Sequence, residues 1–116
     1  MTAIKLSSTN QLNKEQALIS CPVTFTLSKI GGRWKPLIIF QLMSGTKRYG
    51  ELKKSIPNIS EKMLIQHLKE LEADKLVIRK AMPVVPPHVE YSLAEAGEEL
   101  MPILGAMVGW ADKYNV

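Results

Sequence analysis

The feature that most constrains the fold is the segment 60–74, in which leucine recurs at helical spacing. Leu64, Leu68 and Leu71 occupy positions i, i+4 and i+7, so all three lie on one face of an α-helix. Ser60 precedes this repeat and is a favoured N-cap residue. The segment therefore predicts an amphipathic helix that buries its leucine face. The opposite face is polar and basic and carries Lys62, Gln66, Lys69 and Ala73, with Ile65 on its shoulder.

A shorter helix is predicted before this segment and a β-hairpin after it. Residues 49–56 form a short amphipathic segment, and the Pro-Asn pair that follows is typical of a turn. Residues 76–80 are strand-like, and residues 88–93 alternate between apolar and polar side chains. The prolines of segment 83–87 predict a stiff loop between these two strands. The order is therefore a helix-turn-helix followed by a two-stranded hairpin.

The remaining helices are predicted from apolar periodicity and from helix-breaking residues. A proline in the first turn and two glycines at the end bound a helix over residues 22–30. Residues 34–43 predict a buried helix, and residues 10–19 predict a short N-terminal one. Residues 95–114 predict a C-terminal helix, in which Pro102 either introduces a kink or begins a second part.

Charge is distributed unevenly along the chain. Residues 29–80 hold 12 of the 15 basic residues and 5 of the 11 acidic ones, whereas residues 81–116 hold one basic and five acidic residues. A basic middle beside an acidic end indicates that one surface faces a polyanion and another does not. Lysine-rich faces are also common as solvated surfaces, so charge alone leaves nucleic acid as one of two interpretations.

The composition argues against several other classes of protein. The single cysteine, Cys21, excludes an intramolecular disulfide, and together with the distant His67 and His88 it completes no zinc site. No apolar run spans a bilayer and no secretory signal is evident, so a cytoplasmic chain without a metal is expected. The chain contains no catalytic triad, glycine-rich phosphate loop or paired carboxylate site, so neither an enzyme nor a cofactor is predicted.

These elements predict an α+β fold that is mainly α, a winged helix-turn-helix with a two-stranded wing. Residues 1–20 are expected to form an N-terminal arm and dimerisation helix, and residues 21–93 the DNA-binding core. Residues 94–116 are expected to form a C-terminal dimerisation helix. Its apolar stripe needs a partner surface, and in a chain of 116 residues a second copy is the economical answer.

Several motifs follow one another along most of the chain, from about Cys21 to Trp110. They are CP at 21–22, IGGRWKPLI at 30–38, RYGEL at 48–52, IPNISEKML at 56–64, LKELEAD at 68–74 and PPHVEYSL at 86–93. Together they resemble the HxlR family, a MarR-like branch of bacterial winged-helix regulators. The resemblance implies a dimeric transcription regulator that binds a two-fold symmetric operator. It also implies that the recognition helix lies at residues 60–74 and the wing at residues 77–93.

Three positions depart from the usual pattern of this family. His88 stands where the family usually has arginine, so a phosphate contact there is expected to be weaker or pH-sensitive. Lys75 stands where glycine usually follows the helix-ending aspartate, so a different C-cap conformation is expected. Ala94 replaces the usual threonine and cannot cap the last helix, whose start is therefore expected to fray.

The residues expected to contact duplex DNA lie on the recognition helix, on the wing and at the start of the helix-turn-helix. An α-helix enters the major groove, where lysine and glutamine reach base edges or phosphates. The alternatives are an ordinary solvated helix face and a winged helix used for protein–protein contact. The recognition-helix residues are Ser60, Lys62, Ile65, Gln66 and Lys69, and the backbone and wing residues are Arg48, Arg79, Lys80 and His88.

Cys21 has two interpretations, as an inert small residue or as a sensor of oxidants or electrophiles. It precedes a helix, whose positive end can lower a thiol pKa, and some relatives in this family sense oxidants through an N-terminal cysteine. Modification of Cys21 is then expected to release DNA, and any other effector is unknown. The residues predicted to form the homodimer interface are Leu12, Leu100, Leu104, Met107 and Trp110.

Overall fold

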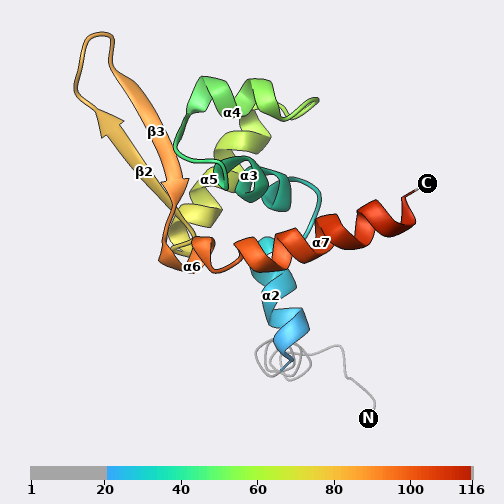
Figure 1. Ribbon diagram of the computed structural model, residues 1–116. Helices are drawn as coiled ribbons and strands as arrows, with labels where there is room; N and C mark the ends of the chain where they lie inside the picture. Colours follow the sequence, from blue (N-terminus) through green and yellow to red (C-terminus); the bar gives the residue numbers. More distant parts are fainter. Residues whose placement is uncertain (1–20, 116) are drawn as a thin grey trace, which may run out of the picture. The chain divides into compact units, whose positions relative to one another are not determined.

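The computed structural model describes residues 21–115. The chain consists of two compact units, residues 1–32 and residues 33–116. The helix expected over residues 10–19 lies outside the described residues. The first unit contributes α2 (Pro22–Ile30). The second unit contains α3 (Trp34–Leu42), β1 (Lys47–Arg48), α4 (Tyr49–Ser55), α5 (Glu61–Ala73), β2 (Val77–Met82), β3 (His88–Leu93), α6 (Glu95–Glu98) and α7 (Met101–Tyr114) (Figure 1).

Helix α2 has the predicted bounds. Pro22 lies in its first turn, and the backbone N–H of Gly31 donates to the carbonyl oxygen of Leu27 at 2.7 Å. A Cβ at residue 31 would collide with that carbonyl oxygen, so glycine is required at this helix end. Val23 and Leu27 of this helix are exposed, whereas Ile30, its last residue, is buried.

The core of the second unit is built around the leucine face of α5. Leu64, Leu68 and Leu71 are buried, as the helical spacing predicted, and α5 packs against α3 and β2. Helix α3 is less buried than predicted, because Leu37 and Phe40 face solvent. The other buried apolar side chains of this unit are Ile38, Ile39, Leu42, Leu52, Ile56, Ile59, Leu76, Val77, Tyr91 and Leu104.

The wing is part of a three-stranded antiparallel sheet, one strand more than predicted. Strands β2 and β3 pair along their full lengths and form the hairpin that projects from the helices (Figure 1). Strand β1 pairs with the other edge of β3, with Lys47 opposite Tyr91 and Arg48 opposite Glu90. Because β1 contains only two residues, it shows no alternating pattern that could have predicted it. It connects the start of α4 to the wing.

Helix α5 ends in a Schellman motif around Lys75. The backbone N–H of Lys75 donates to the carbonyl of Glu72 at 3.0 Å, and that of Leu76 donates to the carbonyl of Leu71 at 2.9 Å. Lys75 has a φ of 60°, in the left-handed region that favours glycine. The expectation of a different C-cap conformation was therefore wrong, since the lysine adopts the conformation that glycine usually provides.

The C-terminal segment forms two helices in place of one. Pro102 lies in the first turn of α7, so it begins a second part of the segment instead of introducing a kink. Ala94 provides no side-chain cap for α6, which is only four residues long. Gly97 of α6 lies against the backbone of Leu76, where a Cβ would collide with the carbonyl oxygen. Neither α7 nor any other described helix has the length and apolar character needed to cross a membrane.

Candidate nucleic-acid interface

Helix α5 presents a polar face on the side opposite its buried leucines. Ser60 is its N-cap, as predicted, and the Ser60 hydroxyl accepts a hydrogen bond from the backbone N–H of Met63 at 3.1 Å. The cap satisfies one of the backbone donors that the first turn of a helix leaves unpaired. Four side chains predicted to contact DNA are exposed on this helix: Lys62, Ile65, Gln66 and Lys69.

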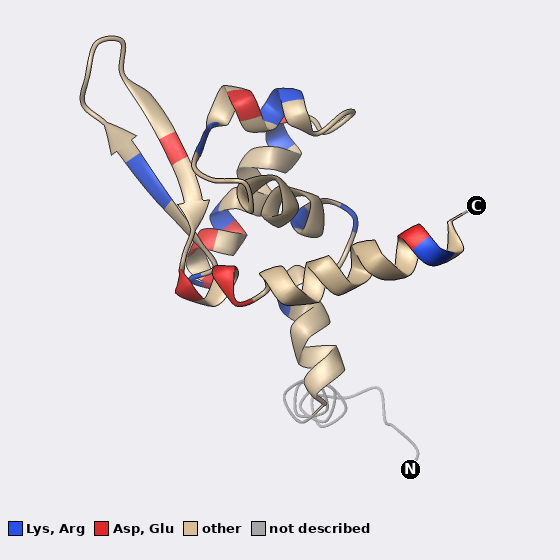
Figure 2. Ribbon diagram, viewed as in Figure 1, with Lys and Arg blue, Asp and Glu red and all other residues tan. Residues whose placement is uncertain are grey.

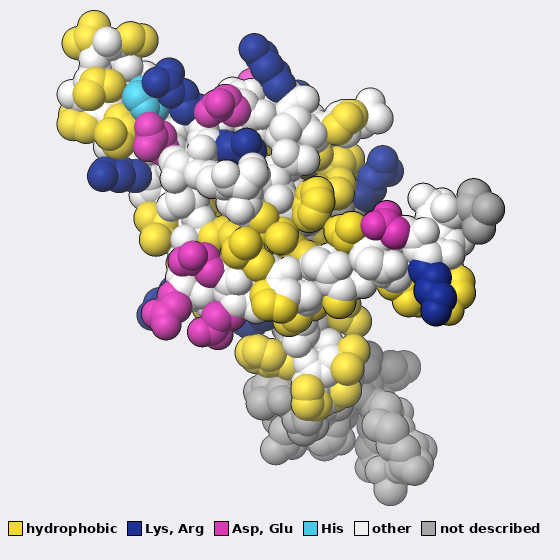
Figure 3. Space-filling view, viewed as in Figure 1, with side chains coloured by type: hydrophobic (Ala, Val, Ile, Leu, Met, Phe, Trp, Pro, Cys, Tyr) yellow, Lys and Arg dark blue, Asp and Glu magenta, His cyan; other side chains and the backbone are white. Residues whose placement is uncertain are grey.

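Basic side chains on the wing and on α4 flank this face. Arg79 and Lys80 are exposed in the middle of β2, and the last turn of α4 carries Lys53 and Lys54 (Figure 2). The tip of the wing, in contrast, is apolar, and hydrophobic side chains gather there (Figure 3). Val85 at this tip is 99% exposed. The positive charge of the wing therefore lies along its length and not at its end.

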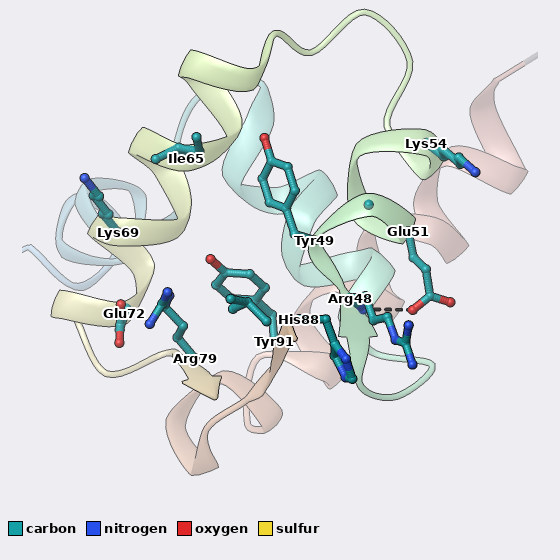
Figure 4. Close-up of a pocket in the computed structure, with 12 residues that line it drawn as sticks. Arg48, Tyr49, Glu51, Lys54, Ile65, Lys69, Glu72, Arg79, His88 and Tyr91 are labelled. Atoms are coloured by element: carbon teal, nitrogen blue, oxygen red, sulfur yellow. Dashed lines mark hydrogen bonds between the residues drawn. The ribbon is translucent and has the colours of Figure 1, made fainter. Parts of the chain in front are cut away.

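A groove of about 870 Å³ lies between α4, α5 and the wing (Figure 4). Cationic side chains from all three elements line it. The lining also contains two carboxylates, those of Glu51 and Glu72, and two tyrosines, Tyr49 and Tyr91. The groove brings together five of the predicted DNA contacts, Arg48, Ile65, Lys69, Arg79 and His88, and leaves Ser60, Lys62, Gln66 and Lys80 outside its lining. Lys54, one of the basic residues around the first helix of the motif that favour DNA, also lines the groove. The lining residues that sequence reasoning missed are Tyr49, Gly50, Glu51, Glu72, Val89 and Tyr91.

Tyr49 places a buried hydroxyl at the groove. Its Oη has no hydrogen-bond partner among the described residues. Burial, with smaller contributions from Glu61 and Tyr91, raises the pKa of Tyr49, so the phenol stays protonated at neutral pH and remains a hydrogen-bond donor. The helix that carries Tyr49 is fixed at its start by Glu51, whose carboxylate accepts a hydrogen bond from the backbone N–H of Arg48 at 2.8 Å (Figure 4).

His88 is held by a neighbour on its own strand. Its Nε2 lies 2.9 Å from Oε2 of Glu90, and both side chains are partly buried. The carboxylate offsets any positive charge on the imidazole. A phosphate contact from His88 is therefore expected to be weaker than one from the exposed Arg79, in line with its departure from the family pattern.

The polar face of α5 is connected to α3 through Glu70. Its Oε1 lies 2.7 Å from Nζ of Lys35, and its Oε2 accepts a hydrogen bond from Nε2 of Gln66 at 3.4 Å. Nδ1 of His67 lies 3.6 Å from the same Oε1. The hydrogen bonds from Lys35 and then Gln66 lower the pKa of Glu70, so this carboxylate is ionised at neutral pH. Sequence reasoning missed this network, although the i, i+4 spacing of Gln66 and Glu70 was a signal for half of it.

Cys21 lies at the N-cap position of α2 and is exposed. Hydrogen bonding to the side chain and then the backbone of Thr24 lowers the pKa of the Cys21 thiol. The thiolate is the nucleophilic form of cysteine, so this environment favours reaction with oxidants and electrophiles.

Helix α7 and its N-cap residue Leu100 contain both exposed and buried members of the predicted dimer interface. Trp110 is 68% exposed, Met107 is exposed as well, and Leu100 is partly buried. Leu104 is only 4% exposed, so it belongs to the core of its own chain and offers a partner little surface. Leu12 lies outside the described residues.

The arrangement of a capped helix with an exposed polar face, a preceding helix and turn, and a following β-wing defines a winged helix-turn-helix transcription regulator. The model of the family described as HxlR-like helix-turn-helix matches residues 29–116. The chain therefore belongs to the HxlR family of DNA-binding transcription regulators.

Individual relatives agree with this assignment. The HTH-type transcriptional regulator YkvN of Bacillus subtilis is 54% identical over 95 residues, which cover 82% of this chain and 80% of YkvN. The redox regulator HypR in its oxidised form superposes with a TM-score of 0.76 at 45% identity, covering 80% of this chain and 96% of HypR. Diamide-treated YodB from B. subtilis superposes with a TM-score of 0.68 at 42% identity, covering 83% of this chain and 96% of YodB.

Proposed function

We propose that this regulator binds a two-fold symmetric operator in duplex DNA as a homodimer. The observation that carries the proposal is the exposed polar face of α5 beside a groove lined by cations from α4, α5 and the wing. A solvated face on a helix needs no adjoining basic groove, so the juxtaposition favours a polyanionic partner over the solvated alternative.

The proposal gives each predicted contact except the helix cap Ser60 a specific role. Helix α5 enters the major groove, where Gln66 meets a base edge and Ile65 meets a thymine methyl group. Lys62 and Lys69 contact flanking phosphates. Arg48 contacts the backbone from the start of α4, and the wing contacts it through Arg79, Lys80 and, more weakly, His88.

Duplex binding is tested by fluorescence anisotropy on DNA fragments that flank the protein's own gene, across a salt series. Tight binding to one fragment that weakens steeply with salt is expected. Lys69→Gln is expected to weaken binding to all sequences about evenly and to reduce the salt slope by about two units, one for each subunit of the proposed dimer. Lys113→Gln, far along α7, is the matched control. Absence of binding to any fragment at low salt would favour the alternative, a winged helix used for protein–protein contact.

The homodimer is proposed from the exposed apolar residues of α7. Exposed tryptophan and methionine side chains close together on one helix indicate an uncovered surface, and a symmetric dimer covers two such surfaces at once. Sedimentation equilibrium is expected to give twice the 13.0 kDa mass of the chain. Trp110→Glu is expected to yield monomers, whereas Lys113→Glu on the same helix leaves the dimer intact. A monomeric parent protein would refute this part of the proposal.

A redox switch at Cys21 is a further part of the proposal. The solved structures similar to this chain include HypR in an oxidised form and YodB after diamide treatment. Because Cys21 is the only cysteine, diamide oxidation must join its thiol to that of a second copy or of a small thiol, while the diamide is reduced to the hydrazine. Diamide is expected to release DNA from the parent protein and not from Cys21→Ser. Equal responses of the two proteins would make Cys21 an inert residue.

A further inference from the structure

Glu70 connects a largely buried cation to an exposed amide. The cation is Lys35 of α3, whose side chain is only 13% exposed and whose Nζ lies 2.7 Å from Oε1 of Glu70. The amide is that of Gln66 on the polar face of α5, whose Nε2 donates to Oε2 of Glu70 at 3.4 Å. One carboxylate group is therefore anchored from the inside of the unit and in turn holds a side chain on the proposed DNA-contacting face.

This arrangement imposes a direction on the Gln66 amide. An ionised carboxylate only accepts hydrogen bonds, so the NH₂ end of the amide must be the end that faces Glu70. The carbonyl Oε1 of Gln66 then points away from Glu70. It accepts no hydrogen bond from any other described residue, which leaves it available as an acceptor.

The direction of the amide has a consequence for base selection. In the major groove, adenine and cytosine each present an exocyclic amino donor, whereas guanine and thymine present a carbonyl acceptor at the equivalent edge. An unrestrained glutamine can rotate its terminal amide by about 180°, so it can contact either an amino-bearing or a keto-bearing base. A glutamine held with its carbonyl outward meets the amino-bearing bases favourably and opposes the keto oxygen of the other two.

We infer that Glu70 is a positioning residue that fixes the Gln66 amide with its carbonyl toward DNA. Through Gln66 it makes the protein select adenine or cytosine, and disfavour guanine and thymine, on the strand that Gln66 contacts at one position of each half-site. This inference rests on the proposed function. It assigns a role to Glu70, which itself touches no base.

The test begins with in-vitro selection of duplex sequences by the parent protein. Binding by Gln66→Ala then identifies the position at which Gln66 acts, because selectivity is lost there alone. At that position the parent is expected to prefer A or C over G or T by about tenfold or more. Glu70→Ala is expected to reduce this preference to about threefold or less, mainly by improved binding of the keto bases.

Two matched variants separate orientation from stability. Lys35→Met removes the anchor but leaves the Glu70 carboxylate as an acceptor for Gln66, so it is expected to lower the melting temperature and to reduce the base preference much less than Glu70→Ala does. Glu70→Gln retains an oxygen that can accept from Gln66 and is expected to recover part of the preference. Circular dichroism confirms that each variant is folded.

The outcomes are distinguishable from those of the proposed function. If the parent selects no sequence, the proposed function fails and the inference fails with it. If the parent selects an operator but Glu70→Ala keeps the full A or C preference, only the inference is overturned. Equal loss of preference in Glu70→Ala and Lys35→Met also overturns it, because the effect would then come from helix placement.

Discussion

The backbone N–H of Leu76 donates to the carbonyl oxygen of Leu71 at 2.9 Å, so the chain turns tightly within residues 74–76, between α5 and the wing. Both leucines are buried, and they occupy the two positions at which apolar residues commonly accompany a Schellman motif. Lys75 occupies the left-handed position of this turn with a φ of 60°. The placement of the wing beside α5 therefore depends on a backbone conformation that a lysine side chain disfavours.

Replacing Lys75 with glycine is expected to stabilise the protein by about 0.5–1 kcal/mol, because glycine removes the steric cost of the left-handed conformation. The comparison is the free energy of unfolding in urea, followed by tryptophan fluorescence. Lys75→Ala is the matched control, since it removes the same charge and retains a Cβ. A glycine variant no more stable than the alanine variant would contradict the assigned conformation.

Replacing Ser60 with alanine is expected to lower the free energy of unfolding by about 1 kcal/mol, because the N–H of Met63 loses its partner. Ser60→Asp keeps an acceptor at the N-cap and adds a negative charge at the positive end of α5, so it is expected to match the parent in stability. Urea unfolding of the three proteins checks both expectations. An aspartate variant as unstable as the alanine variant would argue against the cap.

Much of this fold was predictable because its strongest signals are local. The leucine spacing of α5, the proline and glycines that bound α2 and the alternation of β3 each depend on neighbouring residues in the chain. Pro102 left two outcomes open, since a proline is compatible with both a kink and a first turn. The bounds of α7 answer that question.

The features that were not predicted either depend on contacts between segments far apart in the sequence or belong to very short segments. Strand β1 is defined by its pairing with β3, about forty residues further along the chain, as seen for Lys47 and Tyr91. The link between Lys35 and Glu70 joins two helices, and nothing in the spacing of these residues indicates it. The exposed face of α5 was predictable from periodicity, but the groove beside it was not, because α4, α5 and the wing form it together.

The ion pair between Lys35 and Glu70 predicts a pH dependence of stability. The pKa of Glu70 is lowered in the folded chain, so its contribution to stability is present above the ordinary glutamate pKa of about 4.3 and is lost as the pH falls through the folded value. The parent is therefore expected to exceed Glu70→Gln in stability at pH 7 by more than it does at pH 3.

Thermal melts of the parent and of Glu70→Gln at both pH values measure this difference. Glu72→Gln serves as the control, because Glu72 lies on the same helix and its carboxylate forms no ion pair within the described part of the chain. A stability difference for Glu70→Gln that does not change with pH would mean that the carboxylate acts through packing and not through its charge.

The reactivity of Cys21 is expected to depend on Thr24 and not on the nearby Thr26. Hydrogen bonding to Thr24 lowers the pKa of the thiol, so Thr24→Val is expected to raise that pKa and slow alkylation by iodoacetamide at pH 7. Thr26→Val is the matched control, because the Thr26 hydroxyl donates to the carbonyl oxygen of Pro22 at 2.8 Å and does not interact with the thiol. Alkylation rates are measured by mass spectrometry from about pH 5 to about pH 10, on both sides of the free-thiol pKa of about 8.5, and the midpoint of the rate against pH is compared between the proteins. If the two threonine variants shift this midpoint equally, the general helix environment sets the reactivity of Cys21, and a switch at this residue could not be tuned through Thr24.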